Sequence, residues 1–204
     1  LRPRARAPAP AEPPAPWPVR FADVAAKAGL ARPSVYGGLE MKRFIIETNG
    51  AGAAFFDADG DGWVDALVLN GTRLEEGGRR EAAWPAGQAP VSHLYRNNRD
   101  GTFCDATAQA GFAKTGLAPA VCVGDHDNDG ARDLVVLGMG YNFVCRSDRT
   151  GGLLAWQPLQ PVGWYLRRGV LADVDGDGDL DLLAGPGTTR PNATAQGPLR
   201  QFEN

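Results

Sequence analysis

The 204-residue sequence predicts an all-β protein built from about three repeats of one four-stranded unit. The apolar runs are short, at about four to six residues each, and this length suits strands better than helices. The 27 glycines and 16 prolines favour many turns between short elements. One order of an apolar run, an aspartate-rich loop and a second apolar run also occurs three times along the chain.

Residues 1–18 form a segment of proline, alanine and arginine that we expect to be a disordered linker. Proline fixes φ and lacks a backbone N–H, so neither a helix nor a sheet is expected there. Because the sequence opens at Leu1 rather than methionine, we expect an upstream segment, such as a signal peptide, to have been removed. The repeat region then extends over residues 19–204.

Two kinds of similar segment set the order of elements within each unit. The segment FADVAAKAGL at Phe21–Leu30 is repeated as FCDATAQAGF at Phe103–Phe112. The segment HLYRNNRDGTF at His93–Phe103 has a shortened counterpart in PLRQFEN at the C-terminus, and a degenerate one in the second unit. Each unit is thus predicted to contain a Phe-x-Asp strand, an aspartate hairpin and a closing hairpin. The units cover about residues 21–102, 103–152 and 153–204, the last one truncated.

A unit of about 50 residues with about four strands has the size of a β-propeller blade. The first unit is longer because of an insertion at residues 72–90, which is polar and glycine-rich and is expected to be an exposed loop. A propeller protects its sheet edges by closing into a ring, and about three blades are too few for closure. We therefore expect a partial β-propeller, an open arc of blades with an unpaired final edge.

The three aspartate loops fit the pattern D-x-D/N-x-D-G-x-x-D and are predicted to bind calcium. Carboxylates at positions 1, 3 and 5 can converge on one ion, and glycine at position 6 permits a sharp turn. The carbonyl at position 7 and the aspartate at position 9 can complete a shell of hard oxygen ligands, which selects Ca²⁺. The predicted ligands of about three ions are Asp57, Asp59, Asp61, Trp63, Asp65, Asp125, Asp127, Asp129, Ala131, Asp133, Asp173, Asp175, Asp177, Asp179 and Asp181.

The distribution of charge supports this prediction. More than half of the 24 acidic residues lie in the three loops, beside a single basic residue, Arg132. Without an ion, such crowded carboxylates raise one another's pKa and oppose folding. An EF-hand is the rival interpretation, but the glutamate it needs at position 12 is replaced by Val68, Val136 and Ala184.

Candidates for catalysis are few. The two histidines, His93 and His126, are expected to be packed or solvated, and no serine lies in a G-x-S-x-G motif. Glu40 and Glu47 are more readily interpreted as groups that hold the edge of a strand than as paired acids. We therefore expect no enzymatic activity from this chain. The 3 cysteines leave at least one thiol unpaired, and one disulfide is possible.

Several features bear on partners. Trp156, Trp164 and Tyr165 could form a sugar-stacking platform, or they could pack between blades. The basic residues are scattered rather than gathered in runs, so nucleic acid is not an expected partner. No apolar stretch approaches the ~20 residues that span a bilayer.

The aspartate hairpins, the F-x-D-x-A-x-x-A-G strands and LYRNNRDGTF resemble the FG-GAP/VCBS repeats of integrin-like propellers. The stretch KRFIIETNGAGAAFFDADGDGWVDALVLNG is similar to bacterial proteins related to cartilage acidic protein 1, which often end in an ASPIC/UnbV domain. The resemblance covers about residues 19–185. It implies calcium ligation by the three loops, a propeller of more blades as the complete form, and an extracellular, cell-surface or periplasmic location. The remaining blades of a longer parent chain are therefore expected partners.

These observations together predict a calcium-binding, secreted or cell-surface propeller that acts as a protein- or glycan-binding adhesion scaffold. The alternative is the propeller portion of an extracellular carbohydrate-active enzyme whose catalytic residues lie outside this chain. A cleft lined by an arginine or lysine, a tyrosine or histidine, and a carboxylate outside the loops would favour the alternative. Fold alone does not separate the two.

Overall fold

The computed structural model describes residues 19–38, 40–74, 84–86, 88–139, 142–159, 166–186 and 200–202. The predicted linker at residues 1–18, most of the predicted loop insertion, and Trp164 with Tyr165 lie outside this part of the chain. Within it, strands dominate, and the one helical element is a 3-10 turn, η1 (Ile45–Thr48). No helix of the described residues has the length and apolar character needed to cross a membrane.

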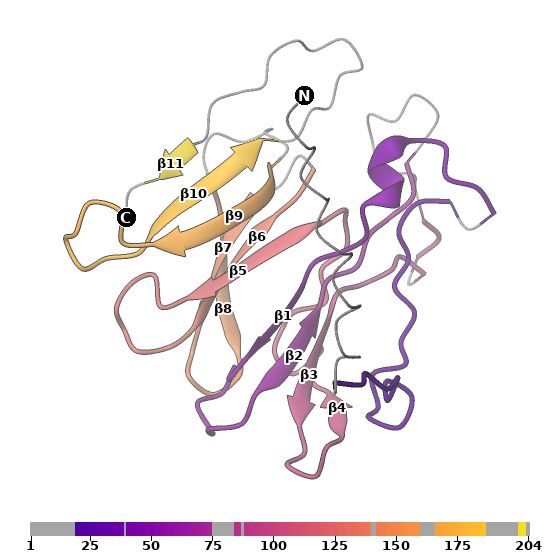
Figure 1. Ribbon diagram of the computed structural model, residues 1–204, viewed down its shortest axis with the longest axis horizontal. Helices are drawn as coiled ribbons and strands as arrows, with labels where there is room; N and C mark the ends of the chain where they lie inside the picture. Colours follow the sequence, from indigo (N-terminus) through magenta and orange to yellow (C-terminus); the bar gives the residue numbers. More distant parts are fainter. Residues whose placement is uncertain are drawn as a thin grey trace, which may run out of the picture.

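The described strands form three antiparallel sheets, each in the order of the chain (Figure 1). The first sheet consists of β1 (Ala53–Phe56), β2 (Asp65–Val68), β3 (His93–Asn97) and β4 (Phe103–Asp105). The second consists of β5 (Ala120–Gly124), β6 (Asp133–Leu137), β7 (Asn142–Ser147) and β8 (Leu153–Pro158). The third consists of β9 (Leu166–Ala172), β10 (Asp181–Pro186) and β11 (Arg200–Phe202). The all-β prediction is confirmed, although the third sheet has three strands in the described residues where four were expected.

Each aspartate loop joins the first two strands of its sheet in the same register. The aspartate at position 9 opens the second strand and lies opposite the last residue of the first strand. These pairs are Phe56 with Asp65, Gly124 with Asp133, and Ala172 with Asp181. The three loops are therefore structurally equivalent, so a feature of one can be compared position by position with the others.

The similar segments at Phe21–Leu30 and Phe103–Phe112 make the same contact in the structure. The Ala28 carbonyl accepts a hydrogen bond from the Phe103 N–H at 2.8 Å, and the Ala110 carbonyl accepts one from the Leu153 N–H at 3.0 Å. Phe103 and Leu153 are the first residues of β4 and β8, the last strands of their sheets. Each segment thus rests on the outer strand of the sheet that follows it in sequence.

The closing hairpins also share one turn, even where the sequence has degenerated. The Asn98 N–H donates to the Thr102 carbonyl and the Asp148 N–H donates to the Gly152 carbonyl, both at 2.9 Å. Arg99 and Arg149 occupy the same left-handed position, with φ of 66° and 63°. The segment RSDRTGG is therefore a closing hairpin like RNNRDGT.

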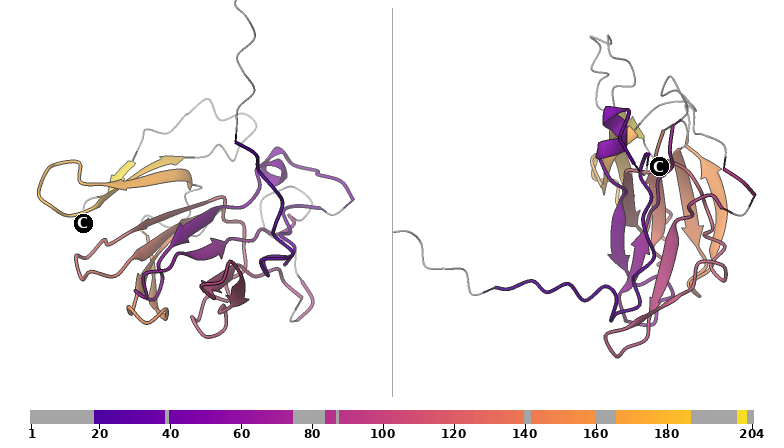
Figure 2. Two further views of the ribbon diagram at one scale, coloured as in Figure 1. Left: turned by 60° about the horizontal axis from the view of Figure 1, so that its bottom comes forward. Right: turned by 90° about the vertical axis from the view of Figure 1, so that its right-hand side faces the viewer.

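The three sheets lie side by side as blades of an arc, with the first strands β1, β5 and β9 next to one another (Figure 1). The two further views show the same open arrangement (Figure 2). Strand β6 is buried along its whole length because both of its faces are covered. Leu134 and Val136 join the core shared with the first sheet, and Val135 and Leu137 join the core shared with the third.

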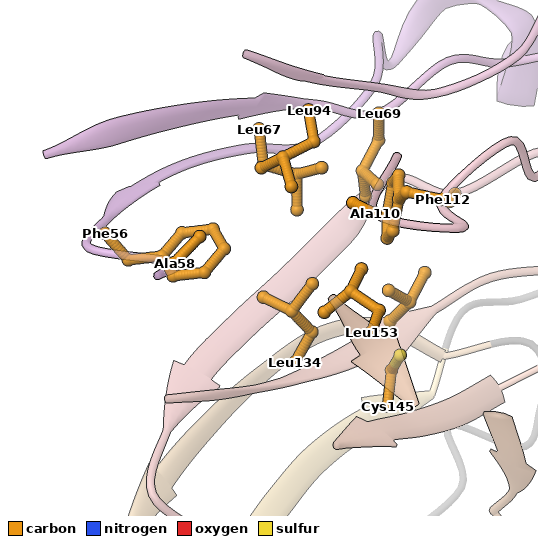
Figure 3. Packing of buried hydrophobic residues seen from close by; sticks show 12 residues of the cluster. Phe56, Ala58, Leu67, Leu69, Leu94, Ala110, Phe112, Leu134, Cys145 and Leu153 are labelled. Carbon is orange, nitrogen blue, oxygen red and sulfur yellow. The ribbon is translucent and has the colours of Figure 1, made fainter. Parts of the chain in front are cut away.

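The larger core lies between the first two sheets (Figure 3). Leu67, Leu134 and Phe112 are almost fully buried there. Trp156 packs against this core, with its ring centroid 5.2 Å from that of Phe112. The packing interpretation therefore holds for Trp156.

The core between the second and third sheets requires a glycine at position 169. A Cβ atom on Gly169 would lie 2.7 Å from Leu137 Cδ1 and 3.2 Å from Cys122 Sγ. We expect Gly169→Ala to destabilise the fold by about 1–3 kcal/mol, because overpacking a close contact forces the surroundings apart. Urea unfolding of Gly185→Ala provides the control, since the added carbon there meets only Arg168, at 3.3 Å. Equal stability of the two variants would contradict the prediction.

Candidate metal centres

The three aspartate loops lie on the same side of the arc, where the β1–β2, β5–β6 and β9–β10 hairpins turn (Figure 1). In each loop, one carboxylate oxygen from positions 1, 3 and 5 lies within 4.8 Å of the others. The three groups are Asp57, Asp59 and Asp61; Asp125, Asp127 and Asp129; and Asp173, Asp175 and Asp177. The structure therefore brings together the first three predicted ligands of every loop.

Each loop is curled by a hydrogen bond from position 6 to position 1. The N–H groups of Gly62 and Gly130 donate to the carboxylates of Asp57 and Asp125 at 2.8 Å, and Gly178 donates to Asp173 at 3.1 Å. The three glycines have φ of 86°, 85° and 98°, a conformation that residues with a Cβ rarely adopt. The loops therefore need glycine at position 6 to adopt this positive φ, as the sequence pattern indicated.

The position-9 aspartates have a different environment from the other carboxylates. Asp65, Asp133 and Asp181 are buried. Their carboxylates accept hydrogen bonds from the position-2 backbone N–H groups of Ala58, His126 and Val174, respectively, at 3.0, 3.2 and 3.1 Å. Each of these carboxylates therefore fastens the start of the loop to its end.

Two of these carboxylates also reach the neighbouring strand. The Asn97 N–H donates to Asp65 and the Ser147 N–H donates to Asp133, both at 2.8 Å. Burial raises the pKa of Asp65, whereas its bonds from Asn97 and Ala58 act to lower it.

Ligation of an ion by position 9, and by the position-7 carbonyls of Trp63, Ala131 and Asp179, stays a prediction.

Arginines from the closing hairpins contact the loop carboxylates, although the loop pattern alone does not predict them. Arg96 pairs with Asp59, and Arg146 pairs with Asp127, both at position 3. Arg99 donates to Asp61 at 2.7 Å, and this bond is the main cause that lowers the Asp61 pKa. Arg96 and Arg146 occupy equivalent positions in their sheets. Each follows a residue that lies opposite the residue just after the position-9 aspartate. An alignment of the two closing hairpins contains that signal.

The second loop contains polar atoms that a cation would satisfy. Asp125 Oδ1 and Asp127 Oδ1 are buried and have no hydrogen-bond partner. A buried oxygen without a partner costs about 1–3 kcal/mol in protein mutational data. Both residues belong to the converging group of that loop, and the group offers only carboxylate ligands. This donor set fits Ca²⁺, because hard cations prefer oxygen ligands.

His126 differs from its expected environment. Its Nδ1 lies 2.6 Å from Asp133 Oδ2, so the imidazole contacts the carboxylate at position 9 of its own loop. His93 lies on β3 beside Thr107 and Asp105, at 3.4 Å from each. Both rings therefore have polar protein partners.

The other candidate residues have structural environments. Glu47 is buried, and its carboxylate accepts N–H bonds from Arg43 at 2.8 Å and from Phe44 and Leu74 at 3.3 Å. This agrees with its interpretation as a group that holds the chain. The possible disulfide is not formed, because all three cysteines are free thiols. Burial raises the pKa of the Cys145 thiol to about 12, which keeps that thiol protonated.

A comparison with protein families now adds to this geometry. The FG-GAP-like repeat matches residues 78–136 and residues 125–184, which together make up just over half of the 204-residue chain. The first match ends in β6, and the second extends from the second aspartate loop into β10. No curated protein matches the chain.

Proposed function

The chain belongs to the FG-GAP-like repeat family, and from this premise we propose that it is a calcium-dependent scaffold of the integrin-like propeller type. In this proposal it is secreted or displayed at the cell surface, and it binds a protein or a glycan. Its finer relationship is to bacterial proteins related to cartilage acidic protein 1. About three calcium ions occupy the aspartate loops, and further blades of a longer parent protein complete the propeller.

The observation that carries the proposal is the repetition of one carboxylate geometry in all three loops. Convergence of three carboxylates in a single loop is common without an ion. Here the same three positions converge in three equivalent hairpins on one side of the arc, and the second loop holds buried oxygens without partners. Arg96, Arg99 and Arg146 offset part of the negative charge of these loops, and bound Ca²⁺ would offset the rest.

The loops connect neighbouring blades, which gives ion binding a role in the scaffold. Ser147, at the end of β7, donates from its Oγ to the Ala58 carbonyl of the first loop at 3.4 Å. Gly151, in the closing hairpin of the second sheet, packs beside Asp59. A rigid first loop therefore fixes the position of the second sheet, and a binding surface that crosses two blades is stabilised.

The carbohydrate-active enzyme is the second candidate, and one cavity bears on it. A cavity of about 170 Å³ lies between the first two sheets, with Arg96, Gln109, Asp148 and Thr150 among its lining residues. It provides an arginine and a carboxylate but neither a tyrosine nor a histidine. The lining of this cavity therefore differs from the cleft that would favour the enzyme.

Trp63 allows a site-specific test of metal binding. It occupies position 7 of the first loop, and its backbone N–H donates to Asp61 at 2.8 Å. Terbium, a luminescent substitute for Ca²⁺, should therefore be sensitised by this indole. We expect luminescence on excitation of tryptophan, its loss on addition of CaCl₂, and its loss in Trp63→Phe and in the double variant Asp59→Asn, Asp61→Asn.

Trp84 provides the matched control for the terbium experiment. Its indole N–H donates to Thr72 at 2.9 Å, and its ring lies against Arg73. Trp84→Phe should therefore leave the luminescence unchanged. Luminescence that persists in the double variant would contradict metal binding by the first loop.

Binding to a glycan panel in CaCl₂ and in EGTA, beside a polysaccharide-cleavage assay, then separates the scaffold from the enzyme.

A further inference from the structure

The three aspartate loops differ in the arginines that contact their carboxylates. Two arginines contact the first loop and one contacts the second loop, and each of them comes from the closing hairpin of the same sheet. The pairs are Arg96 with Asp59, Arg99 with Asp61, and Arg146 with Asp127. In the second loop, the same guanidinium group also lies 3.8 Å from Asp129.

The third loop has no such contact in the part of the chain that the structure describes. Of the ion pairs formed there, none reaches an aspartate of this loop. Asn128 does donate a hydrogen bond to Asp179, but its amide is neutral. Asp179 also lies outside the converging group of carboxylates.

This difference is visible in the sequence at one equivalent position. Arg96 and Arg146 each follow a residue opposite the one just after the position-9 aspartate. In the third sheet, Phe202 lies opposite Leu182, which has that place, and the residue after Phe202 is Glu203. An acidic residue therefore stands where the first two units have arginine.

The arginine contacts leave the loops with different net charges. Every loop carries aspartates at positions 1, 3, 5 and 9. Two guanidinium groups oppose these carboxylates in the first loop and one opposes them in the second, whereas the described residues provide none for the third. The uncompensated negative charge therefore increases from the first loop to the third. Such charge attracts a cation, and the number of charged ligands is one of the factors that tune calcium affinity.

The three arginines remain partly in water. The side chains of Arg96, Arg99 and Arg146 are 49%, 55% and 42% exposed, whereas that of Asp59 is only 4% exposed. Exposed ion pairs of this kind are screened by salt. Each guanidinium group should therefore act on its loop as a nearby positive charge whose effect depends on ionic strength.

We propose that these arginines set the cation affinity of the loops and their preference between divalent and trivalent ions. This inference rests on the proposed function, because it takes the loops to be calcium sites. It adds that the third loop binds Ca²⁺ more tightly than the first two. Removal of Arg96 tightens binding in the first loop, and removal of Arg146 tightens it in the second.

Coulomb's law gives the expected size of the effect. Two like unit charges about 6 Å apart in water change an equilibrium constant about threefold. Because this energy is proportional to the charge of the ion, loss of one arginine should tighten binding about tenfold for a divalent ion and about 30-fold for a trivalent ion. At about 0.15 M salt, where the Debye length is about 8 Å, the gain for the divalent ion should fall to about threefold.

The position-6 glycines allow each loop to be followed separately. Gly62, Gly130 and Gly178 each donate a backbone N–H bond to the first aspartate of their loop. Amide NMR spectra of the full 204-residue chain, titrated with CaCl₂ and separately with diamagnetic LaCl₃, therefore give one midpoint for each loop. In the unmodified chain, the signal of Gly178 should shift at the lowest CaCl₂ concentration.

The variants Arg96→Gln and Arg146→Gln test the charge of each arginine. The first should lower the midpoint of the Gly62 signal and the second that of the Gly130 signal, each by a larger factor for LaCl₃ than for CaCl₂. Both gains should shrink on addition of KCl. The third loop serves as an internal reference, because its midpoint should stay unchanged in both variants.

Two kinds of control separate charge from geometry and from remote effects. Arg96→Lys and Arg146→Lys keep the positive charge but lose the planar guanidinium group, so they should leave the midpoints unchanged. Arg168→Gln removes a charge opposite Gly185, at the end of the β9–β10 hairpin away from the third loop, and should also change none of them. The dispersion of the amide signals checks that every variant is folded.

Several results would overturn the inference while calcium binding itself remains. Unchanged or higher midpoints in the two glutamine variants would show that the arginines do not weaken binding. Equal gains for CaCl₂ and LaCl₃, or the same gain in the lysine variants, would show that the effect is not one of charge. A third loop that does not saturate first would contradict the expected order. If instead none of the glycine signals responds to CaCl₂, the proposed calcium sites fail, and this inference fails with them.

Discussion

Removal of calcium is expected to lower the melting temperature of this chain by roughly 15–30 °C. At a free Ca²⁺ concentration about 100-fold above Kd, each occupied site adds about 2.7 kcal/mol, or roughly 8 kcal/mol for three independent sites. In a domain of this size, each kcal/mol changes the melting temperature by about 2–4 °C. Thermal unfolding followed by circular dichroism, in CaCl₂ and then in excess EGTA, measures the difference.

Magnesium is the control that separates specific ligation from screening of charge. Mg²⁺ demands a tighter octahedral geometry and keeps several waters, so it should restore only a small part of the stability lost in EGTA. Full recovery in MgCl₂ would show that the loops respond to any divalent charge. Equal melting temperatures in CaCl₂ and EGTA would contradict calcium binding at concentrations that matter for folding.

The fold follows from the sequence because the repeat is local. The register of Phe56 with Asp65, for example, is set by a loop whose glycine and aspartates are close together in the chain. Each hairpin can thus be predicted without knowledge of the others. The burial of single strand residues could not be predicted in this way, because the burial of Cys122 and the exposure of Val170 depend on which sheet lies alongside.

The candidate site could be predicted only in part, for a related reason. Position 6 and the converging positions 1, 3 and 5 are local, and the pattern identifies them. The pairing of Arg96 with Asp59 depends on where the third strand lies, and the first loop and this strand are separated by the insertion. Position 9 is ambiguous in the sequence, because an aspartate there can bind an ion, fasten the hairpin, or do both.

Replacement of Asp133 is expected to separate these two roles, since its hydrogen bonds do not depend on an ion. Asp133 is 1% exposed, and it accepts bonds from the backbone N–H groups of His126 and Ser147 and contacts the His126 ring. Asp133→Ala removes the acceptor of these bonds, at about 1–3 kcal/mol for each buried donor that is left unsatisfied. We expect a loss of about 3–5 kcal/mol of unfolding free energy in EGTA, measured by urea denaturation.

Asp129→Ala is the comparison that makes the result decisive. Asp129 lies in the same loop, belongs to the converging group and is more exposed than Asp133. Its removal should change stability little in EGTA but should abolish the part that CaCl₂ adds through this loop. If Asp133→Ala were instead neutral in EGTA and harmful only with calcium, position 9 would be a ligand alone. The hydrogen bonds to His126 and Ser147 would then contribute nothing to the fold, and the hairpin would be held closed by the ion.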